Sequence, residues 1–124
     1  MGLLLDTHVV LWWLEDAATL DSAVKDRLDV DSEIFVSSAT VWEVGIKQAL
    51  GKLIGDGDLA ERVRDSGFAA LPILADHAIA AAALPLHHRD PFDRMLIGQA
   101  ACEGLTLMTR DRHFAAYGVP VESV

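Results

Sequence analysis

Four acidic residues occupy positions from which their side chains could meet: Asp6, Glu43, Asp93 and Asp111. Asp6 ends the first apolar run, and Asp111 follows the apolar stretch TLM by a few residues. Glu43 lies on the helix expected after the second strand, and Asp93 opens the helix expected before TLM. In open parallel sheets, ligands bind just beyond the carboxyl ends of the strands. Carboxylates gathered there repel one another, and such hard oxygen donors suit Mg²⁺ or Mn²⁺. The pattern therefore predicts a divalent-metal site.

Each of these acids also has a purely structural interpretation. Asp6 could cap the helix that follows it, and Glu43 could belong to the polar stripe of a mostly apolar helix. Asp111 is expected to cap the last helix whether or not it has another role. The metal site is predicted by the convergence of the acids, and by none of them alone.

The stretch HRDPFDRMLIGQA, residues 88–100, contains two aspartates three positions apart. Asp90 has a side chain suited to an N-cap, and Pro91 is favoured at the first helical position. Asp93 then falls in the first turn, where the helix dipole stabilises a carboxylate. Helix capping alone explains this stretch, so a chemical role for Asp93 depends on the rest of the chain.

Basic residues stand beside the proposed ligands. Arg94, Arg110 and Arg112 could bind phosphate groups, and ordinary solvated charge beside carboxylates explains them equally well. Lys47 lies one turn after Glu43 on the same helical face, and both explanations hold for it too. The histidines form no obvious pair, and no base is required from among them: His8, His77, His87, His88 and His113.

Short apolar runs alternate with segments of helical periodicity along the chain. Strands are expected at 2–5, 33–36, 68–73, 106–108 and 119–121. Helices are expected at 7–14, 21–28, 39–53, 58–66, 76–84, 90–103 and 111–117. Expected caps and turns are Thr7, Asp21 or Ser22, Ser37 or Ser38, Gly55 with Gly57, Asp58, Asp76 and Gly104. The alternation predicts one α/β domain over residues 1–124, with a central parallel sheet in a three-layer α/β/α arrangement.

Composition narrows the class of protein further. The chain has 124 residues, of which 52% are hydrophobic, so a globular domain with a real core is expected. The longest segment without Asp, Glu, Lys or Arg, residues 77–88, is too short to span a bilayer, and no basic segment precedes the first apolar run. The single cysteine, Cys102, is expected to be buried, and its lack of a disulfide partner agrees with a reducing cytoplasm. A net charge of −9 argues against a protein that coats nucleic acid through a basic surface.

Taken together, four segments resemble the PIN domain and, more narrowly, the VapC-type toxins of bacterial toxin–antitoxin pairs: LLLDTHVVLWWL, SSATVWEVGIK, DPFDRMLIGQA and TLMTRD. The resemblance implies that Asp6 and Glu43 are the first and second family acids. It implies Asp93, in an Asp-x-x-x-Ile pattern, as the third and Asp111, in Thr-x-Asp, as the fourth. Asp90 is then the helix cap and Asp93 the metal ligand.

The resemblance also implies a function. The function it implies is that of an Mg²⁺- or Mn²⁺-dependent endoribonuclease that cuts single-stranded regions of RNA in the cytoplasm. Such toxins form homodimers and are blocked by a small antitoxin protein. Three of the acids, Asp6, Glu43 and Asp93, would hold one ion, with Asp111 closing the site or positioning a second. The residues expected at the substrate or supporting the site are Thr7, Arg94, Thr109, Arg110 and Arg112.

Other functions remain open at this point. The same fold could serve as a non-catalytic interaction module, or the same carboxylates could cleave DNA. A receiver domain is excluded because Asp6 lacks an acidic neighbour and Arg110 stands where a lysine is needed. No Gly-rich phosphate loop is present, which excludes the common nucleotide triphosphatases. Trp12 and Trp13 cannot both face the core, so one of them is expected at a dimer or antitoxin interface, with stacking on an RNA base as the alternative.

Overall fold

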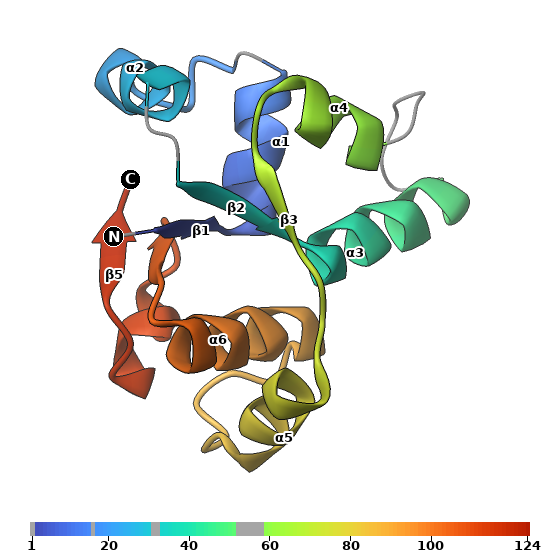
Figure 1. Ribbon diagram of the computed structural model, residues 1–124, viewed down its shortest axis with the longest axis vertical. Helices are drawn as coiled ribbons and strands as arrows, with labels where there is room; N and C mark the ends of the chain where they lie inside the picture. The colour runs from blue at the N-terminus through green and yellow to red at the C-terminus, as the bar shows by residue number, and fades with distance from the viewer. Residues whose placement is uncertain (1, 16, 31–32, 52–58) are drawn as a thin grey trace.

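The described residues form one central parallel sheet with helices around it (Figure 1). The computed structural model describes residues 2–15, 17–30, 33–51 and 59–124. The strands lie in the order β3-β2-β1-β4-β5 and all four neighbouring pairs are parallel. Their bounds are β1 Leu3–Leu5, β2 Ile34–Ser37, β3 Ala69–Leu71, β4 Thr106–Thr109 and β5 Val121–Ser123. The predicted central parallel sheet is confirmed.

Helices cover both faces of this sheet. Figure 1 places α5 and α6 on one side of it and α1, α2 and α4 on the other, which gives three layers. The α-helices span Thr7–Leu14 (α1), Ser22–Val30 (α2), Ser38–Ala49 (α3), Leu59–Asp65 (α4), Ala75–Ala83 (α5) and Pro91–Glu103 (α6). A 3₁₀ helix, η1, follows at Arg112–Tyr117. Among the described residues, no helix is long and apolar enough to cross a membrane.

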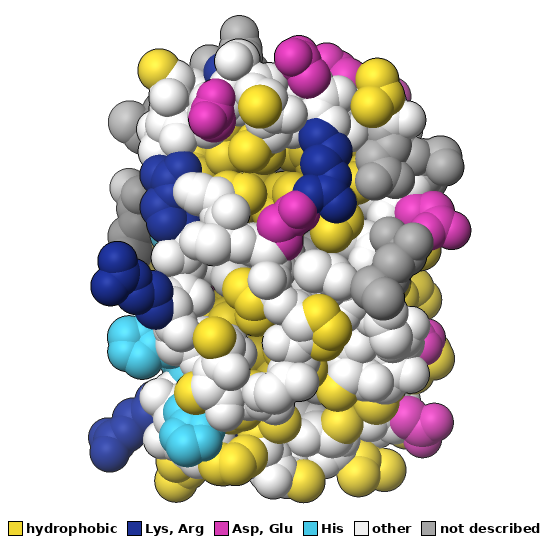
Figure 2. All heavy atoms as spheres, turned by 90° about the vertical axis from the view of Figure 1, so that its left-hand side faces the viewer, with side chains coloured by type: hydrophobic (Ala, Val, Ile, Leu, Met, Phe, Trp, Pro, Cys, Tyr) yellow, Lys and Arg dark blue, Asp and Glu magenta, His cyan; other side chains and the backbone are white. Residues whose placement is uncertain are grey.

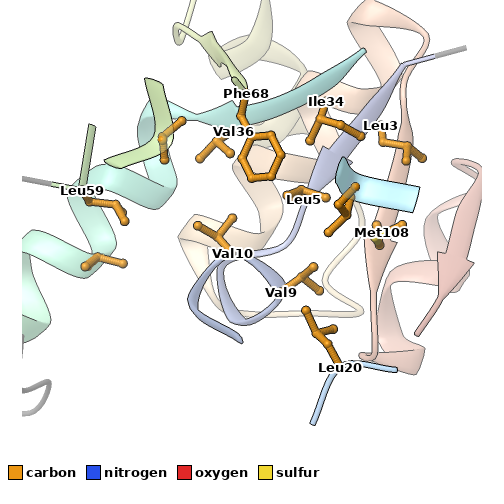
Figure 3. Packing of buried hydrophobic residues seen from close by; sticks show 13 residues of the cluster. Leu3, Leu5, Val9, Val10, Leu20, Ile34, Val36, Leu59, Phe68 and Met108 are labelled. Carbon is orange, nitrogen blue, oxygen red and sulfur yellow. The ribbon is translucent and has the colours of Figure 1, made fainter. Parts of the chain in front are cut away.

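Alternate residues of β1 enter two separate cores. Leu3 and Leu5 belong to the cluster drawn in Figure 3, which also takes residues from α1, α2 and α4. Leu4 belongs to the opposite cluster, with Leu96 of α6 and Phe114 of η1. This alternation follows from the twofold side-chain period of a strand, and it makes β1 the element common to both cores.

The helix pair α5–α6 packs closely because α6 has a glycine at the contact. A Cβ atom at Gly98 would lie 2.9 Å from the backbone nitrogen of Ala81 and 3.0 Å from the carbonyl oxygen of His77. Beside this contact, the buried Gln99 side chain donates to the Pro72 carbonyl oxygen at 3.3 Å. The absence of a side chain at position 98 therefore sets the distance between the two helices.

Several local predictions were confirmed and several were wrong. Ser37 caps α3, accepting from the N–H of Ala39 at 2.9 Å, and Gly104 ends α6 with φ of 65°. Asp76 does not cap α5: the helix starts one residue earlier, and the N–H of Leu74 donates to Nδ1 of His77 instead.

Other differences lie at element ends. The N-cap position of α1 is Asp6 rather than Thr7, and β5 starts at Val121, two residues later than expected. Cys102 is exposed, and not buried as predicted; its Sγ lies 3.7 Å from the carbonyl oxygen of Asp76 in α5. The helix expected at 39–53 ends at Ala49, with Leu50 as its C-cap, and so is shorter than predicted. The turn expected at Gly55 and Gly57 and the cap at Asp58 lie outside the described residues.

Candidate active site

Asp6 directly follows β1, and its carboxylate is bonded mainly to a residue of β4. It occupies the N-cap position of α1, yet its side chain makes no capping hydrogen bond. Its Oδ2 accepts instead from the Thr109 hydroxyl, at 2.7 Å, and the residue is buried. Burial raises the pKa of Asp6 above its usual value, and the bond from Thr109 opposes that rise. The backbone N–H groups of His8 and Thr7 also act to lower the pKa of Asp6, so its position at the start of α1 and its bond from Thr109 both hold the carboxylate.

Glu43 is buried on α3 and its carboxylate is engaged on both sides. The Thr7 hydroxyl donates to Oε1 at 2.8 Å, and Nζ of Lys47 lies 3.1 Å from Oε2. The hydroxyls of Thr7 and Thr40 are also 3.1 Å apart. The Glu43 carboxylate is therefore buried and fixed by these contacts, and it is not part of an exposed polar stripe. The ion pair with Lys47 neutralises part of its charge.

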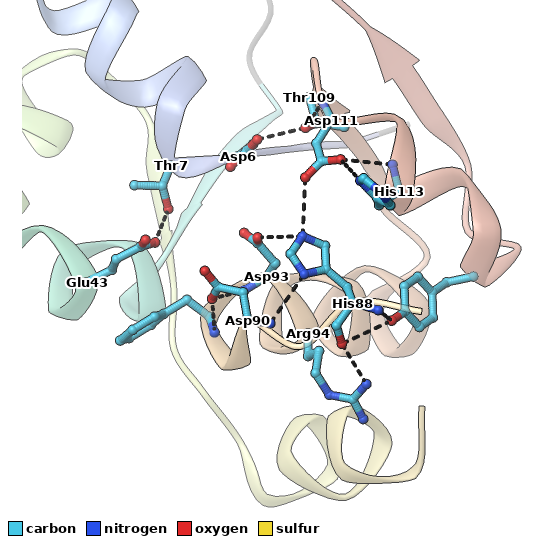
Figure 4. Close-up of polar contacts among 12 residues, drawn as sticks. Asp6, Thr7, Glu43, His88, Asp90, Asp93, Arg94, Thr109, Asp111 and His113 are labelled. Atoms are coloured by element: carbon cyan, nitrogen blue, oxygen red, sulfur yellow. Dashed lines mark hydrogen bonds and ion pairs between the residues drawn. The ribbon is translucent and has the colours of Figure 1, made fainter. Parts of the chain in front are cut away.

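The two aspartates at the start of α6 have different partners (Figure 4). Asp90 is the N-cap: its Oδ1 accepts from the N–H groups of Phe92 at 2.8 Å and Asp93 at 3.3 Å. Asp93 makes no capping bond; its Oδ2 lies 3.0 Å from Nε2 of His88. This division between a capping and a non-capping aspartate is the one predicted.

Asp111 caps the last helix, as predicted, and also contacts a histidine that was not foreseen at the site. Its Oδ1 accepts from the N–H of His113 at 2.9 Å and so caps η1, while its Oδ2 lies 3.2 Å from Nε2 of His88. Partial burial acts to raise the pKa of Asp111, but the hydrogen bonds from His113 and His88 hold it below its usual value. Asp111 therefore stays ionised while it serves as a cap.

Three of the four acids share one cavity. It has a volume of about 330 Å³ and is lined by Asp6, His8, Trp12, Asp93, Arg110 and Asp111. Glu43 is not on its wall. The structure thus brings Asp6, Asp93 and Asp111 together from β1, α6 and the end of β4, and holds Glu43 behind them. His8 is exposed and lies on the wall of the cavity.

Uncompensated negative charge is the main electrostatic property of this cavity. The pKa of Asp93 is raised to about 8, first by burial and then by the charge of its acidic neighbours, Asp90, Asp6, Glu43 and Asp111. Carboxylates that repel one another at a cavity wall fit a hard divalent cation such as Mg²⁺ or Mn²⁺. The donor set therefore fits the predicted ion.

The residues expected to contact substrate divide into three groups. Thr7 and Thr109 are buried behind the carboxylates to which they donate, so they position the acids and do not face a ligand. Arg94 points away from the cavity, because its guanidinium donates to four backbone carbonyls: Ala81, Leu84, Pro85 and His88. Arg110 is on the cavity wall, and Arg112 is exposed beside Asp111.

Arg110 and Trp12 form one side of the cavity together. The Arg110 guanidinium carbon lies 4.5 Å from the centroid of the Trp12 ring, and Nε donates to the Val124 carbonyl at 2.9 Å. Trp13 instead packs on Phe68 in the core. Both tryptophans are half-buried and pack against the core, contrary to the expectation that only one would, and Trp12 also lines the cavity.

Sequence reasoning missed His88, which lies between Asp93 and Asp111. The only signal was its position two residues before the capping Asp90, and the spacing of the histidines showed no pair. Among the described residues, His88, Asp93 and Asp111 are the one group of potential ligand atoms that gathers within metal-binding distance.

Comparison with known proteins gives the family. The PIN domain profile matches residues 3–120. The chain is 30% identical to Ribonuclease VapC22 of Mycobacterium tuberculosis over 125 residues, which cover 94% of this chain and 92% of that protein. The chain therefore belongs to the PIN domain family, and the resemblance inferred from its four motifs is confirmed.

Solved structures show the same fold. A chain of the DNA-bound VapBC complex of Salmonella typhimurium superposes with a TM-score of 0.75 at 20% identity, covering 99% of this chain and 98% of that one. A chain of FitAcB from Neisseria gonorrhoeae gives 0.69 at 24% identity over 96% and 95%. A chain of VapBC-5 from Mycobacterium tuberculosis gives 0.63 at 21% identity over the full length of both. At these identities the likeness establishes the fold alone.

Proposed function

We propose that this chain is a metal-dependent endoribonuclease that hydrolyses phosphodiester bonds in single-stranded RNA. The observation that carries the proposal is the cavity whose wall is shared by Asp6, Asp93 and Asp111, with the pKa of Asp93 raised to about 8. Elevated pKa values of this kind in a cleft are typical of functional sites. The 30% identity to a protein named as a ribonuclease supports RNA as the substrate.

The acids have distinct proposed roles. Asp6, Asp93 and Asp111 would hold Mg²⁺ or Mn²⁺. Glu43 would contribute the carboxylate oxygen to which the Thr7 hydroxyl donates. A divalent ion in such a site supplies a water of lowered pKa as the nucleophile and stabilises charge on the phosphate oxygens. Thr109 fixes the orientation of Asp6, and Lys47 limits the repulsion that Glu43 adds.

Two arginines near the cavity could contact the substrate in spite of the net charge of −9. On the face drawn in Figure 2, most of the Lys, Arg and His side chains lie near one margin, and one more lies further in beside an acidic side chain. Arg110 on the cavity wall and the exposed Arg112 are the arginines that we assign to phosphate contacts. Arg94 is left out of this set, because four carbonyls occupy its guanidinium.

We further propose that the chain is the toxin of a toxin–antitoxin pair, a single PIN domain that forms a homodimer and acts on RNA in the cytoplasm. The VapBC complexes among the similar structures support a small antitoxin protein as the partner.

The test is cleavage of labelled single-stranded RNA and of a DNA strand of matched sequence, with Mg²⁺, Mn²⁺ or EDTA. The wild-type chain is expected to cut RNA only with a metal ion. Asp6→Asn should lose at least 100-fold in rate with an unchanged circular dichroism spectrum, because a ligand charge is removed while the shape is kept. Asp29→Asn, an exposed carboxylate on α2, is the matched control.

Each alternative corresponds to a different result of this test. Cutting of the DNA strand in place of the RNA would make the chain a deoxyribonuclease. Cutting of neither strand, with no heat of metal binding in calorimetry, would overturn the enzyme and favour the interaction module. Full activity of Asp6→Asn would refute the site.

A further inference from the structure

His88 is the residue that connects the third and fourth acids of the site. Its Nε2 lies 3.0 Å from Oδ2 of Asp93 and 3.2 Å from Oδ2 of Asp111 (Figure 4). Asp93 belongs to α6 and Asp111 caps η1, so the imidazole bridges two elements that are far apart in the sequence. No other side chain in Figure 4 contacts both carboxylates.

The backbone and ring of His88 are held from several sides. Its N–H donates to the Tyr117 hydroxyl at 2.6 Å, and its carbonyl accepts from Nη1 of Arg94 at 3.2 Å. The ring packs edge-on against Phe114, with 5.9 Å between centroids. The direction in which Nε2 points is therefore fixed by contacts outside the acidic cluster.

The backbone N–H of Asp90 determines which ring nitrogen of His88 carries the proton. That N–H donates to Nδ1 at 3.3 Å, so Nδ1 presents a lone pair. In the neutral imidazole the proton is then on Nε2, and Nε2–H points at the two carboxylates as a donor. A metal bond at Nε2 would need a lone pair there and a proton on Nδ1, which the N–H of Asp90 opposes.

We propose that His88 is a positioning residue, whose Nε2–H group holds the Asp93 and Asp111 carboxylates together at the spacing that a divalent cation needs. Without a donor between them, the two carboxylates would be driven apart by their mutual repulsion. Each oxygen that accepts from His88 keeps a further lone pair for the ion. Groups that hydrogen-bond to metal ligands commonly change metal affinity 10- to 100-fold when they are removed. This inference rests on the proposed function.

The test compares Mn²⁺ binding by calorimetry in the wild type, His88→Leu, His88→Gln and His87→Gln. His88→Leu removes the donor, and its dissociation constant should rise at least about 10-fold. His88→Gln can place an N–H near the position of Nε2 and should recover most of this loss. His87→Gln, an exposed neighbour, is the control. Long-range ¹H–¹⁵N spectra of the metal-free wild type should show the Nε2–H tautomer.

The outcomes separate this inference from the proposed function. Wild-type affinity in His88→Leu, or a glutamine variant as weak as the leucine variant, would overturn the positioning role even if RNA is cut. An Nδ1–H tautomer, or nitrogen coupling to bound Mn²⁺ in pulsed paramagnetic resonance that is lost in His88→Leu, would make His88 a ligand and also overturn it. Weakened binding in His88→Leu with rescue by glutamine, in a chain that cuts no RNA, would support the inference and refute the ribonuclease.

Discussion

At the scale of single residues, the site depends on side chains that hold other side chains. Thr109 donates to Asp6, Thr7 donates to Glu43, and His88 lies between Asp93 and Asp111. Each hydroxyl is buried next to a carboxylate that burial would otherwise destabilise. These hydrogen bonds fix the positions of the acids before any ion binds. Asp93 is the acid whose pKa is raised most clearly by the charges of the others.

Asp93 gives the metal-free protein a pH dependence of stability. Its pKa is about 8 in the folded state against 3.8 in the unfolded chain, so folding takes up a proton within this window. The contribution of Asp93 to stability is full below about pH 4 and is lost as the pH rises towards 8. In EDTA, Asp93→Asn should therefore be more stable than the wild type by roughly 2–4 kcal/mol at pH 8.5, and by little at pH 4.

Chemical denaturation between pH 4 and 8.5 measures this difference. Asp29→Asn, which changes an exposed carboxylate, should follow the wild-type curve throughout. Parallel curves for wild type and Asp93→Asn would show that the Asp93 carboxylate is solvated in the folded protein, contrary to its place in the structure.

The sequence predicted the acids of the site and, through the family resemblance, their supports Thr7 and Thr109, but it did not predict His88. Asp6, Asp93 and Asp111 could be foreseen, because the ends of parallel strands and the start of a helix fix where such residues lie. His88 could not, because its bridging position arises from the path of the loop before α6 and from the packing of η1. Glu43 was foreseen as an equal ligand, yet the hydrogen bond from Thr7 and the ion pair with Lys47 hold it off the cavity wall.

At the scale of elements, α6 contributes both a residue of the candidate site and a large part of the buried core. Its first turn presents Asp93, and its middle is buried from Leu96 to Ala100. Gly98 lets α5 approach, and Arg94 binds the carbonyls at the end of α5 and in the following loop. The position of the Asp93 carboxylate is therefore linked to the contact between α5 and α6.

A side chain at position 98 should separate these two helices. Gly98→Ala would place Cβ 2.9 Å from backbone nitrogen, which cannot move without shifting α5, so a loss of about 1–3 kcal/mol in unfolding free energy is expected. The control is Gly45→Ala on α3, where nothing lies within 4 Å of the new Cβ and a gain of up to about 1 kcal/mol is expected.

Urea denaturation of both glycine variants checks this prediction. Equal effects of the two substitutions would mean that helix propensity, and not the contact with α5, determines what position 98 tolerates.

Elements were predicted better than their ends. The long helices and central strands follow from periodicity, and the caps at Ser37 and Asp90 follow from side-chain chemistry. The start of α5 was missed because its N-cap residue, Leu74, has no polar side chain, and the atom that accepts from the Leu74 N–H is Nδ1 of His77. The start of β5 was displaced because its register is set by pairing with β4, which a local pattern does not contain.

At the scale of the whole molecule, an acidic chain is expected to depend on cations for its compact state as well as for activity. Mn²⁺ that binds only the folded protein should stabilise it by about 2.7 kcal/mol at a free concentration 100 times its dissociation constant. The melting temperature should therefore rise by several degrees on addition of Mn²⁺, and Asp6→Asn should show little of this rise. Differential scanning calorimetry in EDTA and in Mn²⁺ gives the comparison, and an equal rise in both proteins would indicate binding elsewhere on the acidic surface.

The sheet order has a consequence for local unfolding. β1 and β4, which deliver Asp6 and the segment leading to Asp111, lie inside the sheet, and the N–H of Asp6 donates to the Met108 carbonyl at 3.0 Å. Amide groups in such positions exchange with solvent only when most of a domain opens, whereas the edge strands β3 and β5 can fray without disturbing them. The acids of β1 and β4 are thus expected to keep their geometry through small fluctuations of the fold and to lose it only in global unfolding.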